Sequence, residues 1–600
     1  VGCGACTTRA PNRSTVRPQR LPPLAPSHLE FKILYCKCLA QLCLEAVDRS
    51  PHVNTIYGRT RVRRLRDETA VYHNGILSAT YPVRAEPERL VHLAMLQVVE
   101  PQRVLLVGGL SGTAKEALKY PGVRADVIEL DPQSVAFARR HRPPSPRLDR
   151  ALESGRARLI FRDARRHIFD YWGAPYDAII LNVQQPVTAQ ANRYYTAEFF
   201  RAAKRVLADD GVLAFSVISA VNIATPEVRD FIACLKRTVE KVFTHVAVAP
   251  GTSNVFLAAP GDGAGAEPAP SADEAPPDLL SSLGGAALRK GPITLDPAEL
   301  LDRIRQRGVR TGSFEYLIQG DLNALRVRNL DDVLAESESD RINTDLHPIS
   351  YSYGLVVWTA KARMPGARPW AEMTNAPFRW LQGFAGWTRG RQWAVGLLVL
   401  AGLVTLFLIW QPRRATAACV AVGCSGFTEI GVTIVALLGF QALYGYVYAM
   451  LGVVMASFMV GLCAGAAGAG RVIGRAGRPF RWLLGTQSML ALYPLVLIGI
   501  ILWASRTGAG GWPIVTAFLV LTFVAGAVGG MQLPLAGAVG RGRRGVAATI
   551  SALDLLGAAV GAFTVSAYII PTLGFVTLSL ILSALGLIAL AGLAVAGLRS

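Results

Sequence analysis

A glycine-rich turn between two apolar runs is the segment of this chain best suited to chemistry. The first run, 104–107, leads into Gly108, Gly109 and Gly112, and the second run ends at Glu129, about 20 residues beyond the glycines. Glycine lets the backbone approach a ligand that a Cβ would keep away. An acid at that distance can accept hydrogen bonds from ribose hydroxyls. The turn lacks strict G-x-G-x-x-G spacing, but the acid favours a nucleotide-type site over a plain tight turn.

The elements around this turn alternate between strand and helix. Strands are predicted at 157–161, 176–182 and 212–218, and helices at 132–140 and 196–207. Such alternation is typical of a parallel sheet covered by helices on both faces. The elements that complete this predicted domain are a helix and two strands, at 226–242, 244–248 and 253–258.

The segment upstream of the turn has a different pattern. Residues 53–81 alternate as short strands around Asn74-Gly75, a dipeptide that favours a two-residue hairpin turn. Residues 86–99 follow as an amphipathic helix that leads into the first apolar run. We therefore expect a small β-hairpin region before the larger domain.

Apolar residues are concentrated in the last third of the chain. The 600 residues are 51% hydrophobic and 17% charged, yet 391–600 is almost entirely apolar, Gly or Ala. This part holds seven apolar runs of about 18 residues or more, and a run of that length crosses a bilayer core of ~30 Å. The runs lie at 393–410, 416–440, 446–468, 482–504, 513–538, 546–570 and 573–597. They predict a multi-pass domain in the lipid bilayer.

The net charge of +20 raises the possibility of nucleic-acid binding, and the nine cysteines raise that of a metal site. The positions of these residues argue against both. Arg is scattered through the first part and clustered in short loops between apolar runs, where it sets membrane orientation. We therefore predict no nucleic-acid partner. The cysteine pairs have Cys-x-Cys or similar spacing without suitable histidines, which is poor zinc geometry. Unpaired thiols and no metal are expected.

These patterns divide the chain into predicted regions. The N-terminal segment is unassigned, and residues rich in Pro, Ala, Gly and Asp form a disordered insertion after the α/β domain. The predicted regions are an unassigned segment at 1–52, a β-hairpin region at 53–82, a Rossmann-like domain at 83–259, the insertion at 260–292, a helical connector at 293–390 and the transmembrane domain at 391–600.

Residues 54–259 resemble the polyamine aminopropyltransferases, the spermidine and spermine synthases. The apolar part is similar to the membrane domain of bacterial proteins that fuse a spermidine-synthase-like domain to transporter-like helices. Segments 183–200, 341–358 and 439–465 carry the features of that fused class. The resemblance implies an α/β Rossmann-like methyltransferase fold followed by an all-α transmembrane domain.

The resemblance also implies which residues hold the cofactor. The three glycines match the family's glycine-rich loop, although Ser111 stands where the family has Asp. Glu129 matches the acid that holds the ribose, and Asp163-Ala164 match the pair near the adenine. The implied co-substrate is decarboxylated S-adenosylmethionine or S-adenosylmethionine.

The amine half of the family site is not retained. The family's Asp-x-x-Asp-Pro falls on 182–186, where Asn182 and Gln185 replace both carboxylates. Amides are neutral and cannot serve as bases, and they do not offset the desolvation of a diamine. The family's Gln after Asp-Gly is Ser78, and its Tyr-His-Glu keeps only His92.

Several candidate residues have two interpretations each. His92 is a substitute base or a structural helix residue, and Tyr194 and Tyr195 line an acceptor pocket or belong to the core. Glu429, inside an apolar run, marks a translocation path or a helix contact. Asp554 lies near an Arg-rich loop, which favours an interfacial ion pair.

The Arg-rich loops and the adenosyl ligand together constrain the topology. If all seven runs cross, the loops at 471–481 and 541–544 lie opposite the α/β domain. Arg-rich loops are cytoplasmic, and adenosyl ligands are made in the cytoplasm. We therefore expect six crossings, with either 393–410 interfacial or 416–440 re-entrant. The α/β domain then faces the cytoplasm at a bacterial inner membrane.

Three functions fit the sequence. The first is a membrane-anchored alkyl or aminopropyl transferase acting on a small-molecule amine or another acceptor. The second is a transporter-like protein with a catalytically inactive nucleotide-fold regulatory domain. The third is an S-adenosylmethionine-dependent methyltransferase. The missing carboxylates at 182 and 185 favour the second and third over polyamine synthesis.

Overall fold

The structure is a computed structural model of the chain. It describes residues 50–598 apart from 82–84, 142–144, 187, 220–225, 262–292, 338–340, 351–352, 354–413, 445–447, 477, 508–511 and 541–544. The predicted insertion at 260–292 therefore lies almost wholly outside the described residues, and the apolar run at 393–410 lies wholly outside them. So does most of the N-terminal segment.

A small antiparallel sheet forms the first part of the described chain. Its strands are β1 (His52–Thr55), β2 (Gly58–Leu65), β3 (Glu68–His73) and β4 (Ile76–Tyr81), paired in that order. Asn74 and Gly75 join β3 to β4 with φ of 51° and 81°. These positive values are the ones that a type I′ hairpin turn requires. The segment is therefore a four-stranded sheet, larger than the hairpin that the sequence predicts.

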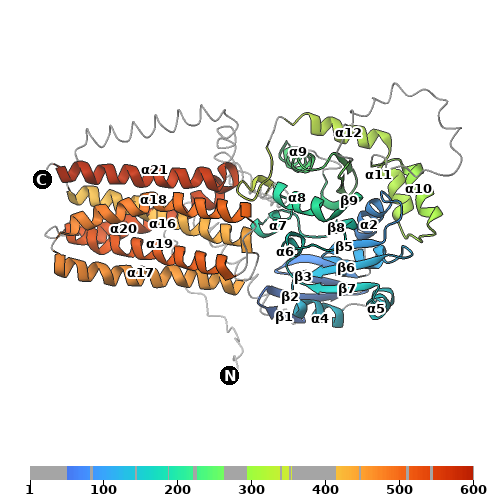
Figure 1. The fold of residues 1–600 in the computed structure, drawn as a ribbon, viewed down its shortest axis with the longest axis horizontal. Coiled ribbons are helices and arrows are strands. Elements are labelled where there is room, and N and C mark those ends of the chain that lie inside the picture. The colour runs from blue at the N-terminus through green and yellow to red at the C-terminus, as the bar shows by residue number, and fades with distance from the viewer. Residues whose placement is uncertain are drawn as a thin grey trace, which may run out of the picture. The chain divides into compact units, whose positions relative to one another are not determined.

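A seven-stranded sheet forms the centre of the α/β domain (Figure 1). Its order is β10-β11-β9-β8-β5-β6-β7. The bounds are β5 (Arg103–Val107), β6 (Arg124–Glu129), β7 (Ala157–Phe161), β8 (Tyr176–Leu181), β9 (Leu207–Ile218), β10 (His245–Ala249) and β11 (Ser253–Ala259). β11 pairs antiparallel with both β9 and β10. The sheet is therefore mixed: β5 to β9 pair in parallel, as the alternating pattern predicts, and the two final strands form an antiparallel hairpin at one edge.

Helices cover both faces of this sheet, as the alternating pattern predicts. One face packs on α2 (Ala85–Met95), α3 (Thr113–Ala117), α5 (Pro146–Glu153), α10 (Pro297–Gln306) and α11 (Phe314–Asp321). The other packs on α6 (Ala164–Phe169), α8 (Ala197–Val206), α9 (Pro226–Glu240) and α12 (Ala324–Ala335). Alternate residues of β5 enter the two cores: Val104 and Leu106 in one, Leu105 and Val107 in the other. The mixed sheet and its helices have the methyltransferase-type fold.

Strand β9 begins earlier than the sequence predicts. The predicted strand begins at Val212, but β9 already starts at Leu207. β8 pairs with it through Tyr176–Leu207 and then Ala178–Val212, with a register shift between the two pairs. The Asp-Asp-Gly segment therefore forms a bulge within the strand.

The C-terminal part is a bundle of long apolar helices (Figure 1). Its helices are α16 (Arg414–Tyr444), α17 (Tyr448–Ala476), α18 (Pro479–Thr507), α19 (Trp512–Val539), α20 (Val546–Thr564) and α21 (Ile570–Leu598), with a π-helical turn, η2 (Val565–Ile569), between the last two. By length and composition the described residues hold 5 candidate membrane spans. The last, Val546–Leu598, is interrupted at Gly574, whose φ is 77°. The chain is therefore a multi-pass membrane protein.

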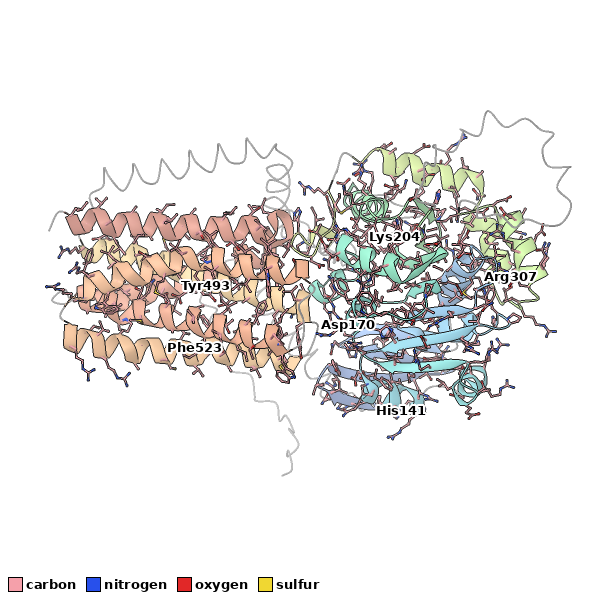
Figure 2. The ribbon with its side chains drawn as sticks, viewed as in Figure 1. His141, Asp170, Lys204, Arg307, Tyr493 and Phe523 are labelled. Carbon is pink, nitrogen blue, oxygen red and sulfur yellow. The ribbon has the colours of Figure 1, made fainter. Side chains whose placement is uncertain are left out.

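Small residues bring α17 and α19 into close contact. A Cβ on Gly461 would lie 2.2 Å from the Phe523 carbonyl oxygen, and one on Gly526 would lie 2.2 Å from that of Phe458. Glycine at such contact points lets the backbones of two membrane helices approach closely. A hydrogen bond also links α18 to α19: the Tyr493 hydroxyl donates to the Leu521 carbonyl at 2.6 Å. Figure 2 labels Tyr493 and Phe523 along the bundle.

Helix α16 corrects one of the two topologies expected from the sequence. A re-entrant segment at 416–440 requires a break in the helix near Gly423 and Gly426, but α16 is continuous over 31 residues. Its glycines contact α20, because a Cβ on Gly426 would lie 2.3 Å from the Asp554 carbonyl oxygen. The re-entrant alternative is therefore wrong, and a six-crossing topology depends on 393–410, outside the described residues.

Candidate functional site

A cavity of about 570 Å³ lies where the C-terminal ends of β5, β6 and β8 meet the small sheet. Gly108 follows β5, Glu129 ends β6 and Asn182 follows β8, and all three line the cavity. The carboxyl ends of parallel strands are where doubly wound sheets bind ligands. The volume falls within the range of small-molecule pockets, about 300–1,000 Å³.

Gly108 shows why this loop needs glycine. Its φ of 73° and ψ of 38° place it in the left-handed region. A Cβ there would lie 2.4 Å from the Asn182 backbone oxygen. The Asn182 side chain donates to the Gly108 carbonyl at 3.1 Å. Two of the predicted site residues are thus joined directly. Gly109 and Gly112 support the same loop but do not line the cavity.

In the described part of the chain, Glu129 is one of two acidic residues that line the cavity. Its Oε1 accepts a hydrogen bond from the Leu110 backbone N–H at 3.1 Å. Burial raises the pKa of Glu129 to about 7, although the Leu110 hydrogen bond acts in the opposite direction. The carboxyl therefore changes charge near neutral pH. Asp131, two residues on, also lines the cavity, but it accepts hydrogen bonds from the Gln133 and Ser134 N–H groups at 3.0 and 3.2 Å.

The predicted adenine pair lies beside the cavity rather than in its wall. Asp163 caps α6 by accepting from the Arg166 N–H at 3.0 Å, and its other oxygen forms an ion pair with Arg193. Neither Asp163 nor Ala164 lines the cavity. Arg193, whose side chain is 4% exposed, also lies over the Tyr194 ring and donates to its hydroxyl at 3.1 Å. This buried ion pair was not foreseen from the sequence.

Neutral side chains line the cavity where the family has its acceptor carboxylates. Asn182, Gln184 and Tyr194 face it, whereas Gln185 is not among the lining residues. Tyr195 is fully buried and donates to the Gln184 carbonyl at 3.1 Å, so it supports the loop from behind. Of the two predicted tyrosines, Tyr194 therefore lines the cavity and Tyr195 belongs to the core.

His92 lies away from this cavity. It is fully buried on α2, where Nδ1 is 2.9 Å from the Tyr120 hydroxyl and Nε2 is 3.3 Å from Glu116. Glu116 also pairs with Lys119, and Lys119 lies 3.7 Å from Glu88. The cluster joins α2 to α3 through ion pairs. His92 is not placed to act as a base in the cavity. Of the two interpretations that the sequence allows, its position favours a structural helix residue over a substitute base.

His73 is the imidazole that lines the cavity among the described residues. Its Nδ1 lies 3.1 Å from the Thr60 hydroxyl. Burial lowers the pKa of His73, against the raising effect of Asp131 and of a hydrogen bond with the Tyr57 backbone. The net lowering favours the neutral imidazole. No sequence motif marked it, because it is simply the last residue before the predicted turn.

The segment 341–350 holds in place the helices that flank Tyr194 at the cavity. Asp345 forms a buried ion pair with Arg165, and Arg165 donates to the Arg193 carbonyl at 2.6 Å. Asn343 is fully buried and donates to the Tyr195 carbonyl at 2.7 Å. The sequence analysis singled out segment 341–358 only because it resembles the fused class of proteins. Its contacts show that it fixes the α7–α8 region (Ala189–Val206), which presents the tyrosines.

The fold and the glycine-loop cavity define a methyltransferase-type domain joined to a membrane domain. Residues 84–257 match the family model described as spermine/spermidine synthase domain. A polyamine aminopropyltransferase of Pyrobaculum calidifontis is 30% identical over 232 residues, which cover 38% of this chain and 71% of the relative. The chain belongs to the spermine/spermidine synthase family.

Other relatives match shorter stretches. Polyamine aminopropyltransferases of Korarchaeum cryptofilum and Aeropyrum pernix are 34% and 33% identical, over 21% and 26% of this chain. The chain spans 38% and 49% of their lengths. The solved spermidine synthase from Thermotoga maritima is 17% identical, with a TM-score of 0.34, and the match covers 48% of this chain and 87% of that one.

Proposed function

We propose that this protein is a membrane-anchored transferase that binds decarboxylated S-adenosylmethionine or S-adenosylmethionine. The observation that carries the proposal is the convergence of Gly108, Glu129 and Asn182 on one cavity. The positive φ of Gly108 and its close approach to the Asn182 backbone are what a glycine-rich ligand-binding turn requires. The Glu129 carboxylate would accept the ribose hydroxyls, and the cavity has room for a nucleoside-sized group.

The ligand supplies an alkyl group on a sulfonium centre, and the protein supplies orientation. Nucleophilic displacement forms the new bond to the acceptor, breaks the carbon–sulfur bond and leaves a neutral thioether. Such a reaction needs alignment more than charge stabilisation. In this proposal Tyr194 and the amides of Asn182 and Gln184 orient the acceptor. The acceptor's proton then leaves to solvent or to the His73 imidazole.

The acceptor is proposed to be neutral or singly charged rather than a diamine dication. Asn182 and Gln184 cannot offset the desolvation of two ammonium groups. Asp131 is already engaged by the cap of α4 (Pro132–His141), and Glu129 faces the nucleoside end. The acceptor wall therefore selects against polycations. This feature separates the proposal from spermidine synthesis itself.

A transfer assay tests this proposal. The purified full chain is incubated with decarboxylated S-adenosylmethionine and putrescine, and spermidine is measured by mass spectrometry. We expect little or none, since loss of a general base costs roughly 10²–10⁴-fold. Robust spermidine formation would overturn the acceptor proposal. Methyl transfer from S-adenosylmethionine to a neutral amine would instead identify the methyltransferase alternative.

A non-catalytic module is the second candidate, favoured by the amides at both family carboxylate positions. Such a domain binds the adenosyl ligand, transfers nothing and regulates the membrane bundle. Tight binding with no product from any acceptor tried would support it. In either case we propose that the domain faces the cytoplasm at a bacterial inner membrane, where adenosyl ligands are made.

A further inference from the structure

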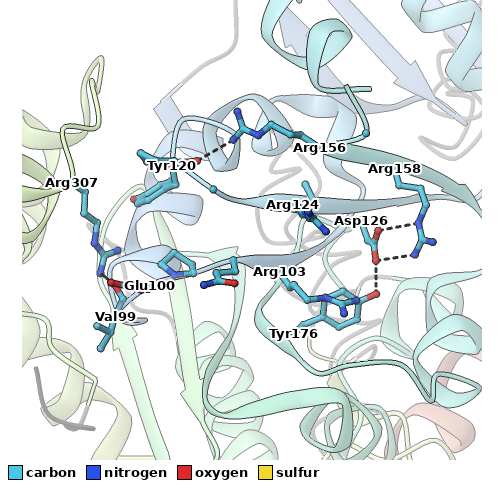
Figure 3. A pocket seen from close by; sticks show the side chains of 16 residues that line it. Val99, Glu100, Arg103, Tyr120, Arg124, Asp126, Arg156, Arg158, Tyr176 and Arg307 are labelled. Atoms are coloured by element: carbon cyan, nitrogen blue, oxygen red, sulfur yellow. Dashed lines mark hydrogen bonds and ion pairs between the residues drawn. The ribbon is translucent and has the colours of Figure 1, made fainter. Parts of the chain in front are cut away.

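A second and larger cavity, of about 860 Å³, lies at the other end of the strands of the seven-stranded sheet, away from the first cavity (Figure 3). Arg103, Arg124 and Tyr176 are the first residues of β5, β6 and β8, and Arg156 comes just before β7. The N-terminal ends of these parallel strands therefore line it. Strands of five or six residues separate this edge from the first cavity by roughly 15 Å. The two cavities are distinct.

Positive charge dominates this second cavity, which we name the arginine groove. Its charged lining residues are Arg103, Arg124, Arg156, Arg158 and Arg307 against Glu100 and Asp126. Among the described residues, only Arg158 of these arginines has a carboxylate within ion-pair distance. Its two donors lie 3.1 Å from the two oxygens of Asp126. Asp126 also accepts from the Tyr176 hydroxyl at 2.8 Å, so this carboxylate is already held by two partners.

Neutral acceptors orient three of the other guanidinium groups, those of the half-buried Arg103 and Arg307 and of the exposed Arg156. Arg103 donates to the Tyr171 hydroxyl at 2.9 Å, and Arg156 donates to the Tyr120 carbonyl at 3.2 Å. Arg307 donates to three backbone carbonyls at and beyond the end of α2. Carbonyl and hydroxyl groups orient a guanidinium without neutralising its charge. The groove therefore presents fixed cations with little compensating negative charge.

Arg307 and Arg124 show that this charge is available. Burial lowers the pKa of Arg307, and Arg303 acts in the same direction against the effect of Glu100. A bound anion would relieve that destabilisation of the cation. Arg124 is exposed at the start of β6 and, within the described part of the chain, has no carboxylate at ion-pair distance.

We infer that the arginine groove binds a small phosphorylated polyanion. Guanidinium groups match phosphate oxygens in a bidentate way, which favours phosphate over a single carboxylate. The groove's volume suits a small molecule rather than a long nucleic acid. Several pre-oriented arginines within one cavity match two or more linked phosphates. This site goes beyond the proposed transferase reaction and would let a phosphorylated metabolite act on the domain from the far edge of its sheet.

Calorimetric titration of the detergent-solubilised full chain with tripolyphosphate at low ionic strength tests this inference. We expect saturable one-site binding that added NaCl weakens. Arg124→Gln with Arg156→Gln should weaken it at least tenfold, because each charge-assisted contact is worth about tenfold or more. The matched control is Arg328→Gln, an exposed arginine on α12 outside the groove, which should bind as the wild type does.

Further arms separate folding effects and ligand sources. Arg124→Lys with Arg156→Lys keeps the charge and should retain part of the affinity, and the melting temperatures of all variants should agree with that of the wild type. Dihexanoyl phosphatidylglycerol, below its micellar concentration, represents a lipid headgroup, and ATP represents a nucleotide. No binding of tripolyphosphate, or an equal loss in Arg328→Gln, would overturn the inference. Binding of the lipid probe alone would also overturn it.

Discussion

Glu129 offers the sharpest test of the adenosyl-ligand site, because its charge state and its contact are both defined. Burial raises its pKa to about 7 in the ligand-free protein. Ribose hydroxyls that donate hydrogen bonds to the two carboxylate oxygens of Glu129 favour its ionised form. Ligand binding should therefore lower the pKa of Glu129. The affinity should therefore rise as pH increases through 7. If only the carboxylate binds, the dissociation constant at pH 6 is about tenfold larger than at pH 8.

Removing the charge should remove both the affinity and its pH dependence. In Glu129→Gln, loss of a charged acceptor costs about 1.5–3 kcal/mol, or roughly 10–100-fold in the dissociation constant at pH 8. Isothermal titration at pH 6, 7 and 8 measures both quantities. Exposed Asp210→Asn is the matched control and should follow the wild type. A flat profile in the wild type, or an unchanged profile in Glu129→Gln, would refute the reasoning.

Three further predictions address the loop, the buried ion pair and the orientation. Gly108→Ala should abolish ligand binding and lower stability by about 1–2 kcal/mol or more in chemical denaturation, because its φ is 73°; wild-type stability would contradict this. Arg193→Met should cost up to about 3–5 kcal/mol by removing the cation that balances the mostly buried Asp163 carboxylate, and adding Asp163→Asn should recover part of it; no recovery would show that the pair is not coupled. In a cysteine-free background, single cysteines at positions 265 and 543 should both resist a membrane-impermeant thiol reagent in intact cells, and labelling of only one would place the domain and the Arg-rich loop on opposite sides.

Local signals allowed the meeting of the strand-end residues at one cavity to be predicted from the sequence. Gly108 and Glu129 end consecutive predicted strands, and parallel strand ends must meet at one edge of the sheet. Asn182 follows the neighbouring strand, so its place in the same cavity also follows from strand order. The long apolar helices were equally predictable, because span length and hydropathy are properties of a continuous segment.

Contacts between distant segments could not be predicted in the same way. Arg193 meets Asp163 across 30 positions, and Asp345 meets Arg165 across 180, with no periodicity to indicate either pairing. His73 enters the cavity only because the small sheet packs there. The mixed edge of the large sheet was missed for a related reason: a short β10–β11 hairpin and a parallel strand have similar local sequences.

The central claim is that the cavity beside Gly108 binds an adenosyl sulfonium ligand. Calorimetric titration of the purified full chain with S-adenosylmethionine, and separately with its decarboxylated form, tests this claim most directly. The account predicts one-site binding of at least one of the two at pH 8, with the tighter ligand identifying the donor. Absence of binding for both ligands, in protein that unfolds cooperatively, would contradict it.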